Sequence, residues 1–337
     1  MRHRSIPCQQ LEENFMKTIS LAALAMVAVT ATGFAATAQT AYPEKTITIA
    51  VAYPPGGFND QVARMIAEDF SERWDQTTVV DNRPGGGTVV GTDIVAKADP
   101  DGYTIGISPF AFGVNPGLFP ELPYDSREDF AHVIVLGDAF NVLVAHPEFE
   151  SNTVAELVEY AKANPGDINY ASAGNGSSNH LSGELFKSLA GLDLVHIPYG
   201  GSAPARTDLV AGRVDVMFDN YTNVKELIEA GNLKALGVTL TEESPLMPGV
   251  PPVSDTVEGY EVTTWWGVMA PKGTPDDVIA KLNEALNDFL TKPKTKEVFA
   301  NQGITEIGGS PEDAEAFVSG QMDKWIPVAE SANMAVD

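Results

Sequence analysis

Cysteine is almost absent from this chain. Of its 337 residues one is cysteine, Cys8, and it lies close to the N-terminus. A lone thiol excludes a disulfide framework and a metal site built from several thiolates. Avoidance of cysteine is typical of proteins that work in an oxidising compartment, where a stray thiol forms the wrong disulfides.

Basic residues are also scarce. Lys and Arg number 21 against 46 Asp and Glu, which gives a formal net charge of −25. Nucleic acids and anionic membranes attract basic surfaces, so this balance argues against both as partners. An anionic ligand would have to be held against the field of the whole protein, either by local dipoles or in a salty medium that screens the field.

Long apolar runs are missing except near the N-terminus. The sequence from Met16 has one Lys, then an apolar segment of small residues, then Ala-Thr-Ala at 36–38, which is the pattern of a secretory signal. We expect residues 1–41 to be an N-terminal extension and signal peptide, cleaved near Ala38 or Ala41. An uncleaved anchor is the less favoured alternative, because the run is short and rich in alanine.

Motifs of the common catalytic sites are missing as well. The sequence has no G-x-S-x-G, no H-E-x-x-H and no Walker lysine. Ser177 and His180 are the nearest hydroxyl and imidazole, but three residues on one helical turn is not the geometry of a catalytic triad. His132, His146 and His196 lie at strand ends without the spacing of metal ligands. We therefore predict no catalysis, no metal and no cofactor.

What the sequence does contain is a regular alternation of strands and helices. Strands are expected at 46–52, 77–81, 103–108, 131–137, 141–145, 168–172, 193–199, 214–218, 233–239 and 263–271. Helices are expected at 60–74, 154–163, 180–191, 203–211 and 222–230, with two more that open at 274–277 and 310–313. This alternation predicts an α/β protein with mainly parallel sheets, helices on both faces, and a ligand site at the carboxyl ends of the strands.

Three helix starts carry capping residues. Thr153 is followed by Glu156 at capping-box spacing. Thr274 and Ser310 are each followed by proline and acidic residues, so each hydroxyl is expected at a helix N-cap with proline at the first helical position.

Three strand-to-helix junctions share one composition. They are YPPGGFND at 53–60, SAGNGSSNHL at 172–181 and IPYGGSAPA at 197–205. Each places Gly, Ser or Asn at a helix N-terminus, where backbone N–H groups lack partners and bind carboxylates without a basic side chain. The alternative at each junction is a tight turn with a good cap. Asp60 is expected to cap its helix or order the loop, and the glycine run at 82–91 is set aside because it lacks G-x-G-x-x-G.

These junctions belong to a longer series of motifs. With VVDNRPGGG, PDGYTIGIS, LPYDSREDF, HIPYGGSAPARTDLVAGRVDVMFDN and WWGVMAPKGTP, they resemble in order the motifs of the Bug family. Bug proteins are periplasmic solute-binding proteins of tripartite tricarboxylate transporters. The resemblance covers roughly residues 42–335, nearly the whole of the expected mature chain.

The resemblance implies a fold and a function. The fold is the two-domain periplasmic-binding-protein fold with crossover strands, and we expect domain I at 42–141 plus 262–337 and domain II at 142–261. The implied function is capture of a small carboxylate, a di- or tricarboxylate or related organic acid, in an interdomain cleft. The protein would act as a periplasmic monomer that delivers its ligand to membrane permease subunits, without membrane insertion after cleavage.

The expected ligand-binding residues follow from the junctions and the resemblance together. They are Pro55, Gly56, Gly57, Phe58, Asn59, Asp60, Ser108, Phe110, Ser172, Gly174, Asn175, Gly176, Ser177, Ser178, Asn179, His180, Tyr199, Gly201, Ser202, Ala203, Asp219 and Asn220. Asn59 and Asn179 depart from the hydroxyl residues usual in the family, so the ligand's identity does not carry over. The stretch at 108–119 matches a variable ligand loop, and phenylalanines in it, Phe110 and Phe112 among them, hint at an aromatic or longer aliphatic carboxylate.

Two other functions remain open. A ligand-presenting protein could act on a sensor kinase instead of a permease, and neighbouring genes would separate these two. An enzyme that processes the carboxylate is the third reading, and turnover of the bound ligand would reveal it.

Overall fold

The computed structural model describes residues 42–331, so the predicted signal segment lies outside the described residues. Every helix and strand described below belongs to one compact unit that begins at residue 43. Within 42–331 there is no helix with both the length and the apolar character needed to cross a membrane.

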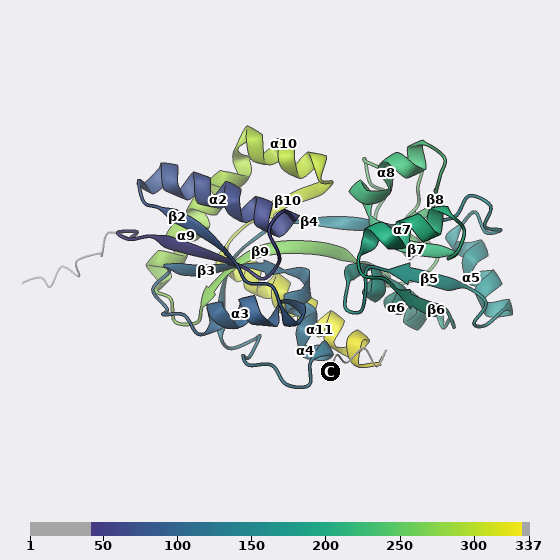
Figure 1. Ribbon diagram of the computed structural model, residues 1–337, viewed down its shortest axis with the longest axis horizontal. Coiled ribbons are helices and arrows are strands. Elements are labelled where there is room, and N and C mark those ends of the chain that lie inside the picture. The colour runs from purple at the N-terminus through teal and green to yellow at the C-terminus, as the bar shows by residue number, and fades with distance from the viewer. Residues whose placement is uncertain (1–41, 332–337) are drawn as a thin grey trace, which may run out of the picture. The chain divides into compact units, whose positions relative to one another are not determined.

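The described strands form one mixed sheet of ten strands (Figure 1). They are β1 Ile47–Val51, β2 Thr78–Asn82, β3 Thr104–Pro109, β4 Phe130–Ala145, β5 Asn169–Ser172, β6 Val195–Pro198, β7 Val216–Asn220, β8 Lys234–Val238, β9 Thr263–Pro271 and β10 Ile304–Gly308. The strand order is β2-β1-β3-β9-β4-β7-β5-β6, and β8 and β10 also pair with β4. The outer strands are parallel, as predicted, whereas β4 and β9 run antiparallel to all their partners.

Ten helices and two short 3-10 turns accompany the sheet. They are α2 Phe58–Trp74, α3 Val89–Ala96, α4 Phe110–Leu118, α5 Val154–Ala163, α6 Ser178–Ala190, α7 Ser202–Val210, α8 Tyr221–Glu229, α9 Asp276–Thr291, α10 Pro293–Asn301 and α11 Pro311–Ser331, with η1 Gly86–Thr88 and η2 Val253–Asp255, all within the described residues. The apolar stripe predicted for α2 is confirmed, since Val62, Ile66 and Phe70 are buried. The sequence did not predict α3, α4, α10 or β10.

Strand β4 links the two halves of the sheet. The two strands predicted at 131–137 and 141–145 are one strand of 16 residues, so the predicted break between them is wrong. Its first part pairs with β9 and β10 as far as Phe140, and from Asn141 onward it pairs with β7 and β8. The proposed domain boundary at 141–142 lies where β4 changes partners.

The helix caps agree with the sequence at two of three positions. The hydroxyl of Thr153 accepts a hydrogen bond from the Glu156 N–H at 3.1 Å, and that of Ser310 accepts one from the Asp313 N–H at 3.2 Å. The prediction for Thr274 is wrong. Pro275 takes the N-cap of α9, and the Thr274 hydroxyl turns back to donate to the Pro271 carbonyl at the end of β9.

Helix α4 occupies the stretch that the sequence indicated as a ligand loop. Phe110 packs edge-on against Trp325 of α11 with ring centroids 5.4 Å apart, and Phe112 packs against Phe130 at 5.0 Å. Both phenylalanines are buried in the main hydrophobic core. Phe110, which was predicted to bind the ligand, and its neighbour Phe112 therefore stabilise the fold instead.

Gly91 allows α3 to pack closely against the end of β1. A Cβ atom at Gly91 would lie 2.6 Å from the Ala52 Cα and 2.9 Å from the Arg83 carbonyl oxygen. Gly91→Ala is therefore expected to lower the free energy of unfolding by about 1–3 kcal/mol, the usual cost of overpacking. Urea unfolding monitored by circular dichroism measures the change.

Gly320 provides the matched control for this substitution. It lies in α11 with no atom within 4 Å of an added Cβ. Gly320→Ala is expected to raise the free energy of unfolding by about 0.5–1 kcal/mol, because alanine restricts the unfolded chain and favours helix. Equal effects at the two positions would show that the Gly91 contact is not tight.

Candidate functional site

A pocket of about 540 Å³ lies where three loops and helix α4 meet. It is lined by Ala52, Tyr53, Pro54, Pro84, Gly85, Gly86, Gly87, Thr88, Ala111, Asn115, Leu118, Phe119, Asn175, Gly176 and Ser177. The loops follow β1, β2 and β5, so they come from both halves of the sheet. Every lining side chain is neutral, and an anion held here depends on backbone N–H groups, hydroxyls and amides.

The structure brings part of the predicted site to this pocket. Asn175, Gly176 and Ser177 line it directly. The predicted residues from Pro55 to Asp60 follow immediately after the lining Pro54, in the loop before α2 and in its first turn, and they are not among the lining residues. Those at 199–203 lie in the loop before α7 and at its start, and they do not line the pocket either.

The N-terminus of α2 has no side-chain cap. Gly57 occupies the N-cap with φ −86°, and no side chain accepts a hydrogen bond there. The Asp60 carboxylate accepts from the Gly56 N–H at 3.0 Å, so Asp60 orders the loop as predicted. Arg64 pairs with Asp60 at 2.9 Å, and this hydrogen bond lowers the pKa of the Asp60 carboxyl. Its charge is thus offset beside helix N–H groups that favour an anion.

Phe58 contributes to packing at the start of α2. Its ring lies edge-on to Trp266 at 4.7 Å and to Phe299 at 5.7 Å. The ring therefore joins α2 to β9 and α10. Asn59, beside it, is partly buried and its Oδ1 has no hydrogen-bond partner among the described residues.

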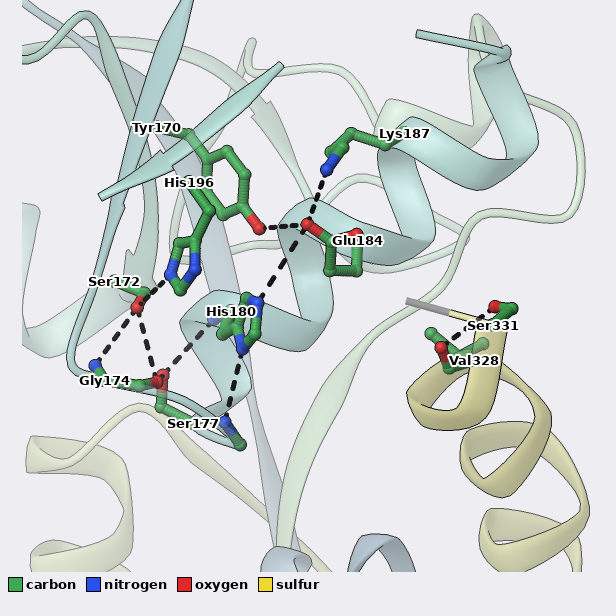
Figure 2. A network of polar contacts seen from close by, with 11 residues as sticks. Tyr170, Ser172, Gly174, Ser177, His180, Glu184, Lys187, His196, Val328 and Ser331 are labelled. Carbon is green, nitrogen blue, oxygen red and sulfur yellow. Dashed lines mark hydrogen bonds and ion pairs between the residues drawn. The ribbon is translucent and has the colours of Figure 1, made fainter. Parts of the chain in front are cut away.

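The loop between β5 and α6 is held by its own hydrogen bonds (Figure 2). The Ser172 hydroxyl accepts from the Gly174 N–H at 3.1 Å, and the Ser177 hydroxyl donates to the Gly174 carbonyl at 2.7 Å. The Gly176 N–H donates to Nδ1 of His180 at 3.3 Å. The N–H groups of Gly174 and Gly176 are thus engaged within the protein, while Asn175 is exposed at the tip of the loop.

Behind this loop lies a pair of stacked histidines. The rings of His180 and His196 are 3.8 Å apart and nearly parallel, and Tyr170 stacks on His196 at 4.9 Å. Glu184 faces the stack, accepts hydrogen bonds from Tyr170 and Lys187, and lies 4.0 Å from Nε2 of His180 (Figure 2). Burial lowers the pKa of His180 to about 3 and that of His196 to about 4, so both rings are neutral at pH 7.

The neutral histidines predict a pH dependence of stability. The unfolded chain takes up protons on His180 and His196 as the pH falls below about 6.5, whereas the folded rings stay neutral until about pH 4. The free energy of unfolding is therefore expected to decrease over this window, by about 1.4 kcal/mol for each unit of pKa depression. Above pH 6.5 the two rings contribute no slope. Urea unfolding at pH 7, 6, 5 and 4 measures the decrease in the free energy of unfolding.

Substitutions separate the contribution of His180 and His196 to the pH dependence from that of other titrating groups. His132, in β4, contributes to the same window because burial lowers its pKa to about 4. The double change His180→Asn and His196→Gln should therefore reduce the slope without abolishing it. A double variant with the wild-type slope would contradict the assignment.

Asp219 joins the N-termini of three helices. It is fully buried, and its oxygens accept hydrogen bonds from Arg206 of α7 at 2.8 Å, Asn179 of α6 at 3.1 Å and Asn223 of α8 at 3.0 Å. The Asn220 N–H completes the set at 2.9 Å. This carboxylate is therefore occupied by protein donors and orients the helices around it.

The other predicted residues are mostly buried beside these elements. Ser108, at the end of β3, is 1% exposed and its hydroxyl has no partner among the described residues. The Asn220 side chain donates to Asn141 of β4 at 3.0 Å. Ser178 is the first residue of α6 and is partly exposed.

Comparison with known proteins defines the family. Residues 62–334 match the family described as "Tripartite tricarboxylate transporter family receptor". The chain belongs to this family. Its members are periplasmic solute-binding proteins, and the resemblance to Bug proteins seen in the sequence is confirmed.

Relatives support the assignment to this receptor family over most of the chain. Protein BugT of Bordetella pertussis is 37% identical over 294 residues, covering 85% of this chain and 89% of BugT. The UPF0065 protein in the tcbD-tcbE intergenic region of a Pseudomonas species is 40% identical over 287 residues, covering 85% of both.

Solved structures of the receptor family show the same fold. A protein of R. palustris, Rpa4515 with adipate, is 35% identical, with a TM-score of 0.74 over 87% of this chain and 99% of that one. MatC of Rhodopseudomonas palustris, with bound malate, is 30% identical, with a TM-score of 0.71 over 86% of this chain and 100% of that one. The two-domain periplasmic-binding-protein fold predicted from the sequence is confirmed.

Several lining residues of this receptor were missed by sequence reasoning. The glycine run at 82–91, set aside for lack of a dinucleotide motif, supplies five of them from Pro84 to Thr88. Helix α4 supplies Ala111, Asn115 and Leu118, although its stretch was interpreted as a loop. The signal that could have found them is that the glycines directly follow β2, which pairs with β1 in parallel. Adjacent parallel strands end at the same edge of a sheet, so the loops after β1 and β2 lie together.

Proposed function

We propose that this receptor binds a small carboxylate in the pocket described above and delivers it to the membrane subunits of a tripartite tricarboxylate transporter. The observation that carries the proposal is the pocket itself, whose lining is rich in glycine and contains no charged side chain. Backbone N–H groups and neutral donors hold carboxylates in such sites. Adipate and malate in two related structures support the same class of ligand.

The geometry suggests how capture proceeds. The uncapped start of α2, at Gly57, presents N–H groups to one carboxylate, and the exposed Asn175 approaches from the other half of the sheet. Closure of the proposed domains about β4 and β9 then encloses the ligand, and the closed form is the one the permease recognises. We place the mature protein in the periplasm as a monomer that performs no catalysis.

Calorimetry tests the proposal directly. The protein, expressed without residues 1–41 and refolded to remove any carried-over ligand, is titrated with C4–C8 carboxylates and with the corresponding uncharged amides. Carboxylates are expected to bind and, at a hundred times Kd, to add about 2.7 kcal/mol to the free energy of unfolding. Equal binding of acids and amides would refute an anion site. Uptake by cells that lack the gene tests delivery to the transporter.

A further inference from the structure

The side chains that line the pocket are of two kinds. The apolar ones are Ala52, Pro54, Pro84, Ala111, Leu118 and Phe119. The polar ones are Tyr53, Thr88, Asn115, Asn175 and Ser177. The number of these polar groups that are available to a ligand decides which carboxylates fit.

Most of the polar side chains are already engaged within the protein. The Asn115 amide donates to the Gly87 carbonyl and to the Thr88 hydroxyl, both at 3.0 Å. The Ser177 hydroxyl donates to the Gly174 carbonyl at 2.7 Å and accepts from the backbone N–H of His180 at 3.3 Å. Their hydrogen bonds shape the loops, and they leave few side-chain donors for a second or third anionic group on a ligand.

The remaining polar groups are neutral. Tyr53 offers a hydroxyl, and burial raises its pKa to about 12, so the phenol stays protonated at pH 7. Asn175 offers an amide at the exposed tip of its loop. Together with the N–H groups at the start of α2, the Tyr53 hydroxyl and the Asn175 amide provide donors for one carboxylate. They provide no cation for a second carboxylate.

Leu118 and Phe119 contact the two glycine-containing segments of the pocket, η1 and the loop before α6. A Cβ atom at Gly176 would lie 2.8 Å from Cδ1 of Leu118, and one at Gly87 would lie 2.9 Å from Cζ of Phe119. Hydrocarbon side chains therefore touch both the η1 segment and the loop before α6. A hydroxyl or carboxylate on the body of a ligand would lose water against this wall without gaining a partner.

From this lining we infer that the ligand is a monocarboxylate with an apolar body, a ring or a chain of about six carbons, rather than a short hydroxylated di- or tricarboxylate. The inference rests on the proposed function, because it assumes that the pocket binds a carboxylate. The carboxylate meets the α2 N-terminus and Asn175, and the body of the ligand lies along Leu118 and Phe119.

A matched ligand series tests the inference with the unmodified protein. Calorimetry compares butanoate, hexanoate and octanoate, then hexanoate with adipate, and phenylacetate with malate and citrate. Affinity is expected to rise about fourfold for each added methylene, because each buried CH₂ is worth about 0.8 kcal/mol. Hexanoate is expected to bind at least about tenfold more tightly than adipate, because the second carboxylate of adipate would lie against the apolar wall.

A substitution tests whether Phe119 contacts the apolar body of the ligand. Phe119→Gln is expected to flatten the methylene series and to reduce the preference for hexanoate over adipate, and Phe119 is only partly buried, so the fold tolerates the change. Leu122→Gln is the matched control, since Leu122 is also partly buried and does not line the pocket. Its series should match the wild type.

The outcomes distinguish the two proposals. Tighter binding of adipate, malate or citrate than of hexanoate and phenylacetate overturns the apolar-body inference and leaves the carboxylate site standing. Equal binding of hexanoate and hexanamide overturns the carboxylate site itself. An unchanged series in Phe119→Gln removes Phe119 from the wall and overturns the assignment of the apolar surface.

Discussion

Replacement of Asp219 by alanine is expected to lower the free energy of unfolding by about 3–5 kcal/mol, the cost of breaking a buried ion pair. The change leaves Arg206, whose side chain is 21% exposed, without its carboxylate. It also removes the acceptor of the buried Asn179 amide and of the partly buried Asn223 amide. The starts of α6, α7 and α8 lose the group that joins them. Urea unfolding at pH 7 gives the difference.

An exposed ion pair provides the control for Asp219. Asp323 pairs with Arg127 across a distance of 2.6 Å, with side chains 71% and 43% exposed. Asp323→Asn is expected to change the free energy of unfolding by less than about 1 kcal/mol. If Asp219→Ala proves as mild as Asp323→Asn, the buried network does not organise the three helices.

The second large effect is expected on ligand affinity. Gly57→Leu should weaken carboxylate binding at least about a hundredfold, or 2.8 kcal/mol. Its side chain would stand beside the first N–H groups of α2, where we propose that the carboxylate approaches. No atom lies within 4 Å of a Cβ at Gly57 and its φ is negative, so the fold has room for leucine. Calorimetry with the ligand that binds best measures the loss.

The same substitution elsewhere tests whether the effect is local. Gly320→Leu also places a side chain in open space, on α11, and should leave the affinity unchanged. Unfolding midpoints of both variants show whether the fold is intact. Unaltered affinity in a folded Gly57→Leu protein would remove the α2 N-terminus from the site.

The sequence predicted the elements whose stability comes from local patterns. Strand β9 was predicted with the bounds observed, and the Thr153 cap and the apolar stripe of α2 were predicted correctly. Helix α4 was missed because Gly113, Pro116 and Gly117 disfavour helix. Tertiary packing overrides that preference: a Cβ at Gly117 would lie 2.9 Å from the Ala329 Cβ, so glycine lets α11 approach.

The candidate site was predicted in part for a related reason. The loop that contains Asn175 was found from its composition and lies at the pocket. The segment from Pro84 to Thr88 was rejected on its local motif, although it follows a strand that pairs with β1. Strand order is set by contacts between distant residues, so no short stretch of sequence reveals it.

The insertion of β9 between β3 and β4 has a consequence for the order in which the nascent chain folds. Ser108 of β3 pairs with Gly267 of β9, so the first half of the sheet is incomplete until the last third of the chain has been made. Pairings this distant form late and slowly, because a long loop must close first. Strand β3 leaves the ribosome well before β9 exists, so we expect one edge of β3 to lack its partner during most of synthesis.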